Sequence, residues 1–210
     1  MSPEDTLGRM RREAPLKVAL VADDLTGALD SCVPFALAGL SVAVALRPDD
    51  IAAALATGAQ VVGAVTASRA MQPGEAAVAA RDVGRRLCAA RPQIVFKKID
   101  SRLKGNLVAE TAALAEVFAR GRAVIAPAVP DQGRFVVDGD VIGNGVGTRL
   151  GIAAAFAGLN LPFAIADTRS DADLDGVIDA SHDHSETILV APAALAPRLR
   201  GRLEPPAPRR

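Results

Sequence analysis

Short apolar runs rich in β-branched residues alternate along this chain with longer amphipathic segments rich in Ala and Leu. The runs that predict strands are Lys17–Ala22, Ser41–Leu46, Gln60–Val65, Gln93–Ile99, Ala123–Ala126, Phe163–Ala166 and Thr187–Val190. The segments that predict helices are Gly27–Ala38, Asp50–Ala56, Pro73–Ala90, Leu107–Ala119, Thr148–Leu159, Ala172–Ala180 and Ala193–Leu199. Alternation of this kind is typical of a parallel sheet with right-handed crossovers. We therefore expect an α/β fold: a doubly wound, mostly parallel sheet with helices on both faces (Rossmann-like).

The alternation is interrupted once and is absent at the two ends. Phe135–Gly147 is rich in Gly and Val without a helical period, and it predicts a hairpin or an extended lid. Residues 1–15 are charged and aperiodic, and residues 201–210 are rich in Pro and Arg. We expect both ends to be disordered tails that flank one α/β domain at residues 16–200.

Charge and hydropathy argue against two classes of partner. The chain has 24 basic and 24 acidic residues, so no overall field attracts nucleic acid or anionic lipid. The longest apolar stretch is broken by a glycine, an asparagine and a proline, which argues against a membrane span. No apolar leader is visible, and Cys32 and Cys88 lie in apolar helical patterns typical of small buried residues in a reducing compartment. We expect a cytoplasmic protein that binds neither nucleic acid nor membrane.

Two adjacent carboxylates follow the first predicted strand. Asp23 and Asp24 come directly after its apolar run, and Thr26 and Gly27 lie at the start of the next helix. In open α/β sheets, ligands bind at the carboxyl ends of strands. A single Asp before Thr would predict a helix cap as readily as a site, but a doublet at a strand end favours chemistry.

Three further polar clusters follow other predicted strands. Lys98, Asp100 and Ser101 lie in a basic loop that predicts an anion site, with a solvated, capped loop as the alternative. Arg69 predicts a carboxylate clamp or an ordinary surface residue, and Arg134 follows a turn made rigid by two prolines and a glycine. Because all four clusters follow strands, we expect one polar cleft at one edge of the sheet.

Metal and nucleotide motifs are not apparent. The His182-Asp183-His184 run has no third ligand at metal-site spacing, and a solvated loop is the favoured interpretation. Neither of the two glycine-rich phosphate-binding patterns occurs. We expect no metal site and no nucleotide site in this chain.

Four motifs in order carry a family resemblance. Residues 22–28 (ADDLTGA), 66–69 (TASR), 97–106 (KKIDSRLKGN) and 127–134 (PAVPDQGR) are similar to the N-terminal sugar-binding domain of the four-carbon acid sugar kinases, which include 3-oxo-tetronate and D-threonate kinases. The resemblance covers about residues 17–145. It implies that this domain binds a sugar acid, that a separate C-terminal domain binds ATP with Mg²⁺, and that the phosphoryl group is transferred between them.

The resemblance also implies roles for the clustered residues. Asp23 and Asp24 would be the catalytic residues, contacting sugar hydroxyls, with one of them accepting the proton of the attacking hydroxyl. The substrate-binding residues would be Thr26, Gly27, Arg69, Lys98, Asp100, Ser101 and Arg134. Of these, Arg69, Lys98 and Arg134 would hold the carboxylate or the developing phosphate charge.

The chain also departs from the family pattern. Arg102 stands where Thr is usual and Lys104 where Arg is usual, and the segment after Gly139 lacks the usual aromatic and Pro-Leu. Family members continue for about twice this length, so we expect the ATP-binding domain to be absent here. The favoured hypothesis is a substrate-binding half that needs a separately encoded nucleotide-binding partner, with an exposed apolar face for that partner or for a homodimer. The alternatives are a non-catalytic sugar-acid-binding module, a truncated pseudoenzyme or, less favoured, a metal-dependent hydrolase, so enzymatic activity itself stays open.

Overall fold

A computed structural model describes residues 16–181, 183–200 and 203. Its main sheet has seven strands in the order β2-β3-β1-β4-β10-β5-β9, and every neighbouring pair is parallel. The strands are β1 (Val18–Ala22), β2 (Val42–Ala45), β3 (Val61–Val65), β4 (Ile94–Lys98), β5 (Arg122–Ile125), β9 (Phe163–Ile165) and β10 (Thr187–Ala191). All seven predicted strands are present, and the predicted α/β fold class is confirmed.

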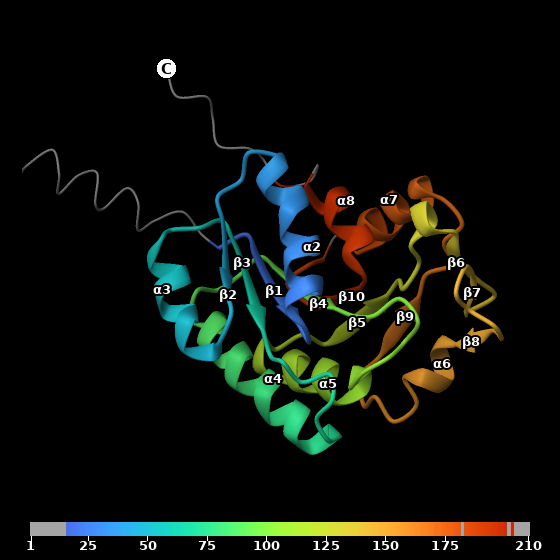
Figure 1. Ribbon diagram of the computed structural model, residues 1–210, viewed down its shortest axis with the longest axis horizontal. Coiled ribbons are helices and arrows are strands. Elements are labelled where there is room, and N and C mark those ends of the chain that lie inside the picture. The colour runs from blue at the N-terminus through green and yellow to red at the C-terminus, as the bar shows by residue number, and fades with distance from the viewer. Residues whose placement is uncertain (1–15, 182, 201–202, 204–210) are drawn as a thin grey trace, which may run out of the picture.

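Helices cover both faces of this sheet (Figure 1). One face carries α2 (Leu25–Leu37), α7 (Asp171–Ala180) and α8 (Ala196–Arg200), and the other carries α3 (Ile51–Ala56), α4 (Pro73–Cys88) and α5 (Leu107–Val117). Three short 3₁₀ turns, η1 (Pro48–Asp50), η2 (Pro130–Gln132) and η3 (Ala193–Leu195), lie in the connections. Among the described residues, no helix combines the length and apolar character needed to cross a bilayer.

Side chains of β1 alternate between the two helical layers. Val18, Leu20 and Ala22 pack with the α2, α7 and α8 layer, whereas Ala19 and Val21 pack with the α3, α4 and α5 layer. All five are buried, because helices cover both faces of the parallel sheet. This burial explains why the strand is a continuous apolar run rather than an alternating one. The charged residue Asp23 directly follows the end of the buried strand.

The segment predicted as a hairpin forms a small antiparallel sheet. It contains β6 (Arg134–Val137), β7 (Asp140–Gly143) and β8 (Leu150–Gly151) in that order, and α6 (Ile152–Ala155) follows. The helix predicted over Thr148–Leu159 is therefore wrong at both ends, because α6 spans only Ile152–Ala155. Leu150 and Gly151 pair with β7 as a strand, and Gly158 adopts φ +87°, a left-handed conformation at which a helix cannot continue.

The predicted tails lie almost wholly outside the described residues, as does His182 of the predicted solvated loop. Leu203 is the exception within 201–210: it is buried and packs with the α2, α7 and α8 layer.

Candidate functional site

The acid doublet lies at the carboxyl end of β1 and is bound by Arg69, which follows β3. Arg69 donates through Nε to Asp23 Oδ2 and through Nη2 to Asp23 Oδ1, both at 2.8 Å. Its Nη1 lies 2.6 Å from Asp24 Oδ2. This fork geometry is the strong, bidentate form of an arginine–carboxylate pair. The guanidinium that the sequence predicts as a clamp for a ligand carboxylate therefore already binds both acids of the protein.

Asp24 also caps helix α2. Its Oδ1 accepts a hydrogen bond from the Gly27 backbone N–H at 2.6 Å, and Asp24 has the extended backbone typical of an N-cap. The capping alternative for Asp24 is thus observed, and it coexists with the contact to Arg69. Thr26 is exposed in the first turn of the same helix.

The Asp23 carboxylate is buried, with 4% of its surface exposed. Burial alone raises the pKa of a carboxyl. Here the hydrogen bonds from Arg69, together with the positive charges of Lys97, Arg69 and Lys98, outweigh burial and hold the pKa of Asp23 below its ordinary value. Asp23 is therefore an ionised and firmly held group.

Lys98, the last residue of β4, projects its ammonium against the first turn of α2. A Cβ built on Gly27 would lie 2.5 Å from Lys98 Nζ, so a side chain at this position would displace the ammonium. Lys98 is 8% exposed, and within the described residues its ammonium forms neither an ion pair nor a hydrogen bond. Burial lowers the pKa of Lys98, although the charges of Asp23 and Asp24 oppose this shift. A largely buried lysine whose ammonium lacks a direct partner is a candidate for receiving an anion.

A cavity of about 530 Å³ opens beside Lys98. Asp100, Ser101 and Arg134 also line it, together with residues of α2 and of the segment after β10. Arg134 donates to the Ser101 hydroxyl, and through Nη2 to Gln132 Oε1 at 2.5 Å. Asp100 Oδ1 accepts from the Arg102 backbone N–H at 2.8 Å, which shapes the loop.

The predicted site residues thus form two adjoining groups. Asp23, Asp24 and Arg69 form a compact charge cluster, whereas Asp100, Ser101 and Arg134 face the cavity. Lys98 belongs to both, because it lines the cavity and its charge acts on Asp23. The structure therefore brings the four sequence clusters to one edge of the sheet, with Lys98 at the junction.

A buried polar network beneath the charge cluster was not predicted from the sequence. Lys97 forms an ion pair with Glu110 of α5, and Ser68 donates to the other oxygen of Glu110 at 2.5 Å. Asn106 donates to the Ser68 and Met71 carbonyls at 2.9 and 3.0 Å and so holds the loop that carries Arg69. The available signal was Glu110 itself, a charged residue placed one turn after Leu107 in a helix otherwise rich in Ala and Leu.

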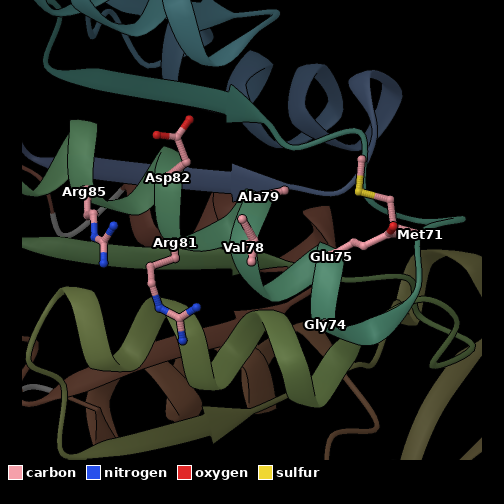
Figure 2. A pocket seen from close by; sticks show the side chains of 8 residues that line it. All are labelled: Met71, Gly74, Glu75, Val78, Ala79, Arg81, Asp82 and Arg85. Carbon is pink, nitrogen blue, oxygen red and sulfur yellow. The ribbon is translucent and has the colours of Figure 1, made fainter.

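A larger groove of about 1040 Å³ lies elsewhere, along the outer surface of α4. Figure 2 shows that its lining comes from α4 and the loop before it. Three of its charged groups have partners within the protein: Arg81 pairs with Glu116 at 2.9 Å, Asp82 pairs with Arg86 at 3.2 Å, and Glu75 accepts from the Gln72 backbone N–H at 3.2 Å. None of the predicted site residues lines it.

Within the described residues, the acid doublet does not fit the Mg²⁺ that the family resemblance implies. Within this part of the chain, no three His, Cys, Asp or Glu side chains are grouped to hold a metal ion. The two adjacent acids are bound to Arg69, which competes with a cation for the same oxygens. We therefore assign none of the described residues to the metal.

Comparison with known proteins is consistent with this geometry. A family model described as "Sugar-binding N-terminal domain" matches residues 18–155. The chain belongs to this family. The matched segment carries every predicted site residue, from Asp23 to Arg134.

Curated relatives are longer proteins with kinase names. The chain is 40% identical over 126 residues to D-threonate kinase of Cupriavidus necator, covering 60% of this chain and 29% of that protein. It is 36% identical over 126 residues to D-erythronate kinase of Heliobacterium modesticaldum, covering 58% of this chain and 28% of that protein. The alignment thus spans less than a third of the length of either relative.

Solved structures share the fold. A protein of Bordetella bronchiseptica, described as a domain of unknown function and crystallised with bound citrate as a domain-swapped dimer, superposes with a TM-score of 0.78 at 25% identity. The superposition covers 88% of this chain and 55% of that chain. The shared fold therefore extends beyond the family segment and includes most of the described residues.

Proposed function

We propose that this chain is the substrate-binding half of a kinase that phosphorylates a four-carbon sugar acid of the threonate and erythronate class, with the nucleotide supplied by a separate partner. The proposal is supported by family membership and by the names of the curated relatives. The observation that carries it in this chain is Lys98, a largely buried side chain at the edge of a polar cavity whose ammonium has no direct acceptor among the described residues. Such a group stabilises a carboxylate or a phosphoryl oxygen that enters the cavity.

The sugar acid would lie with its carboxylate toward Lys98, Ser101 and Arg134. The cavity suits a ligand of this size, and citrate in the Bordetella relative is likewise a small polycarboxylate. The hydroxyls of the sugar would then lie near the first turn of α2, with Asp24 and the exposed Thr26. Phosphoryl transfer depends mainly on such positioning and on neutralising charge.

Of the two carboxylates, we assign the base to Asp24. Its side chain is 32% exposed, so an attacking hydroxyl can reach it. Asp23 is almost fully buried, and both of its oxygens already accept hydrogen bonds from Arg69. Asp23 would instead hold Arg69, and Arg69 would orient Asp24.

The partner would dock on α2. Leu25, Leu29, Val33 and Leu37 recur at every fourth residue on one side of this helix and are between 43% and 77% exposed. An apolar stripe of this kind is typical of an interaction surface. Its middle lies beside the cavity, because Val33 also lines the cavity. A nucleotide-binding domain seated on the stripe would therefore face the sugar acid.

A non-catalytic sugar-acid-binding module is the second candidate. It is favoured by the state of the doublet, since each oxygen of Asp23 and Asp24 already contacts Arg69 or the Gly27 N–H. Such a module would bind the acid through Lys98 and Arg134 and transfer nothing.

Calorimetry followed by a kinase assay separates the two candidates. D-threonate and D-erythronate are titrated into the purified chain, and ATP-dependent phosphorylation is then measured with nucleotide-binding domains encoded in the same genome. Binding plus turnover supports the kinase half, whereas binding without turnover with any partner supports the module. No binding of either acid contradicts both.

Matched variants make the binding measurement specific. Lys98→Met should abolish binding, because it removes the ammonium and leaves an unbranched side chain that is one atom shorter. Lys104→Met makes the same chemical change at an exposed lysine of the same loop and should leave affinity within about twofold, as for most surface changes. Equal affinities for the two variants would refute the role of Lys98.

A further inference from the structure

An almost fully buried ion pair lies next to the charge cluster of Asp23, Asp24 and Arg69. The side chains of Lys97, on β4, and Glu110, on α5, are 2% and 1% exposed and form an ion pair. Removing two charges from water is costly, and apolar residues of similar volume at such a position are often equally or more stabilising. We therefore look for a role of this ion pair other than stabilising the core.

One end of the pair reaches the loop that carries Arg69. Ser68 donates to Glu110 Oε1 at 2.5 Å, and its hydroxyl oxygen lies 2.6 Å from that of Thr66. The Thr66 hydroxyl donates to the Ala22 carbonyl at 3.1 Å. The Thr66 backbone N–H in turn donates to the Ala22 carbonyl at 2.9 Å, at the residue before Asp23. Glu110 is thus connected to the ends of both β3 and β1.

The other end reaches the residue that carries the cavity ammonium. Lys97 Nζ donates to the Lys98 backbone carbonyl at 3.0 Å, in addition to its pair with Glu110. The network therefore ties together the ends of β1, β3 and β4, the strands that deliver Asp23, Arg69 and Lys98. Each of these three residues directly follows a residue of the network in sequence: Asp23 follows Ala22, Arg69 follows Ser68, and Lys98 follows Lys97.

The network also acts on Asp23 through charge. The charged groups acting on this carboxylate are Arg69, from the loop after β3, and Lys97 and Lys98, from β4. Lys97 contributes its positive field but forms its direct pair with Glu110, which leaves both Asp23 oxygens to Arg69. A Lys97 released from Glu110 would compete with Arg69 for Asp23.

We propose that Lys97 and Glu110 are positioning residues of the sugar-acid site: Glu110 retains Lys97 and Ser68, and the network thereby holds Asp23, Arg69 and Lys98 in one arrangement. The assignment rests on the proposed sugar-acid site for its functional meaning, but the arrangement of Asp23 and Arg69 is measurable without any ligand. Neither residue contacts the cavity.

The test uses the double variant Glu110→Gln/Lys97→Met, which removes both charges at nearly constant volume, beside the single variant Glu110→Gln. Glu116→Gln is the control, because Glu116 lies on the same helix in an exposed pair with Arg81. Three quantities are measured: the urea midpoint of unfolding, the titration of the Asp23 carboxyl carbon by NMR, assigned with Asp23→Asn, and the affinity for D-threonate and D-erythronate between pH 5 and pH 9.

We expect the double variant to fold with a urea midpoint at or above that of the wild type. Its Asp23 should titrate at a higher pH, and its affinity for the better of the two acids should fall at least tenfold. Glu110→Gln should also lose affinity, since Lys97 then turns toward Asp23, and Glu116→Gln should match the wild type in all three measurements.

Wild-type titration of Asp23 and wild-type affinity in the double variant would overturn the assignment. Failure of the double variant to fold would also overturn it, because the pair would then serve folding itself. If the wild type binds neither acid, the proposed function fails. The NMR titration of Asp23 still shows whether Lys97 and Glu110 act on the charge cluster.

Discussion

Replacing Gly27 by Ala should damage the anion site while leaving the fold nearly unaffected. The new methyl would lie 2.5 Å from Lys98 Nζ and 2.8 Å from Asp24 Oδ1. To reach ordinary contact, the ammonium must retreat by about 1 Å, a displacement that costs a positioned group on the order of 100-fold. For binding, this corresponds to about 2.7 kcal/mol.

The stability effects of the same substitution nearly cancel. Alanine is favoured over glycine in a helix by about 1 kcal/mol. The crowded Asp24 carboxylate weakens the cap of α2, whose loss costs about 1 kcal/mol. Gly176→Ala is the matched control, because Gly176 lies in α7 with nothing within 4 Å of its would-be Cβ, and it should raise stability by about 1 kcal/mol.

Calorimetric affinity for the bound sugar acid and urea unfolding are measured on both variants. Affinity of Gly27→Ala within twofold of the wild type would refute the argument that Lys98 is held at the anion position by the absence of a side chain. A large loss of stability would show instead that the cap, rather than the ammonium, absorbs the clash.

The remaining predictions concern single charged or titratable groups. Lys98→Met should raise the free energy of unfolding at pH 7 by about 1 kcal/mol while abolishing binding. Because burial lowers the pKa of Lys98, this gain in stability should vanish as the pH rises past 10.5. A gain in stability that persists at pH 11 would contradict the prediction. Asp23→Asn should cost about 2 kcal/mol above pH 4. Since the pKa of Asp23 lies below its ordinary value of 3.8, the wild type should lose this advantage as the pH falls below 4, and parallel acid-unfolding curves would contradict it. Burial raises the pKa of Cys32 to about 12, so mass spectrometry should find Cys32 unalkylated by iodoacetamide at pH 8 until urea unfolds the chain.

The strands were predictable because burial on both faces leaves a strong local signal. Val18–Ala22 and Thr187–Ala191 are continuous apolar runs, each buried along its whole length. The start of the predicted helix at Thr148 was wrong because the structure of this segment depends on a contact distant in sequence. Leu150 and Gly151 become a strand by pairing with β7, a contact that no local period reveals.

The sequence predicts which residues belong to the site better than it predicts how they contact one another. Strand ends marked Asp23, Lys98 and the loop before Arg134, and the structure places them at one edge of the sheet. The contact of Arg69 with both acids depends on β3 lying beside β1, although the two strands are separated by β2 in sequence. Glu110 was missed for the same reason, because its partners Lys97 and Ser68 come from two other elements.

The position of strand β10 in the sheet affects when this protein can fold during its synthesis. Among the described residues it is the last strand in sequence, yet it lies between β4 and β5 and pairs with both. The segment matched by the family model ends at residue 155, so a strand from beyond that segment completes the sheet inside it. A nascent chain that has not yet released Thr187–Ala191 from the ribosome has two unpaired strand edges in the middle of its sheet, open to pairing with other chains. Folding on the ribosome must therefore wait for nearly the whole domain, and the site that depends on β4 is assembled late in synthesis.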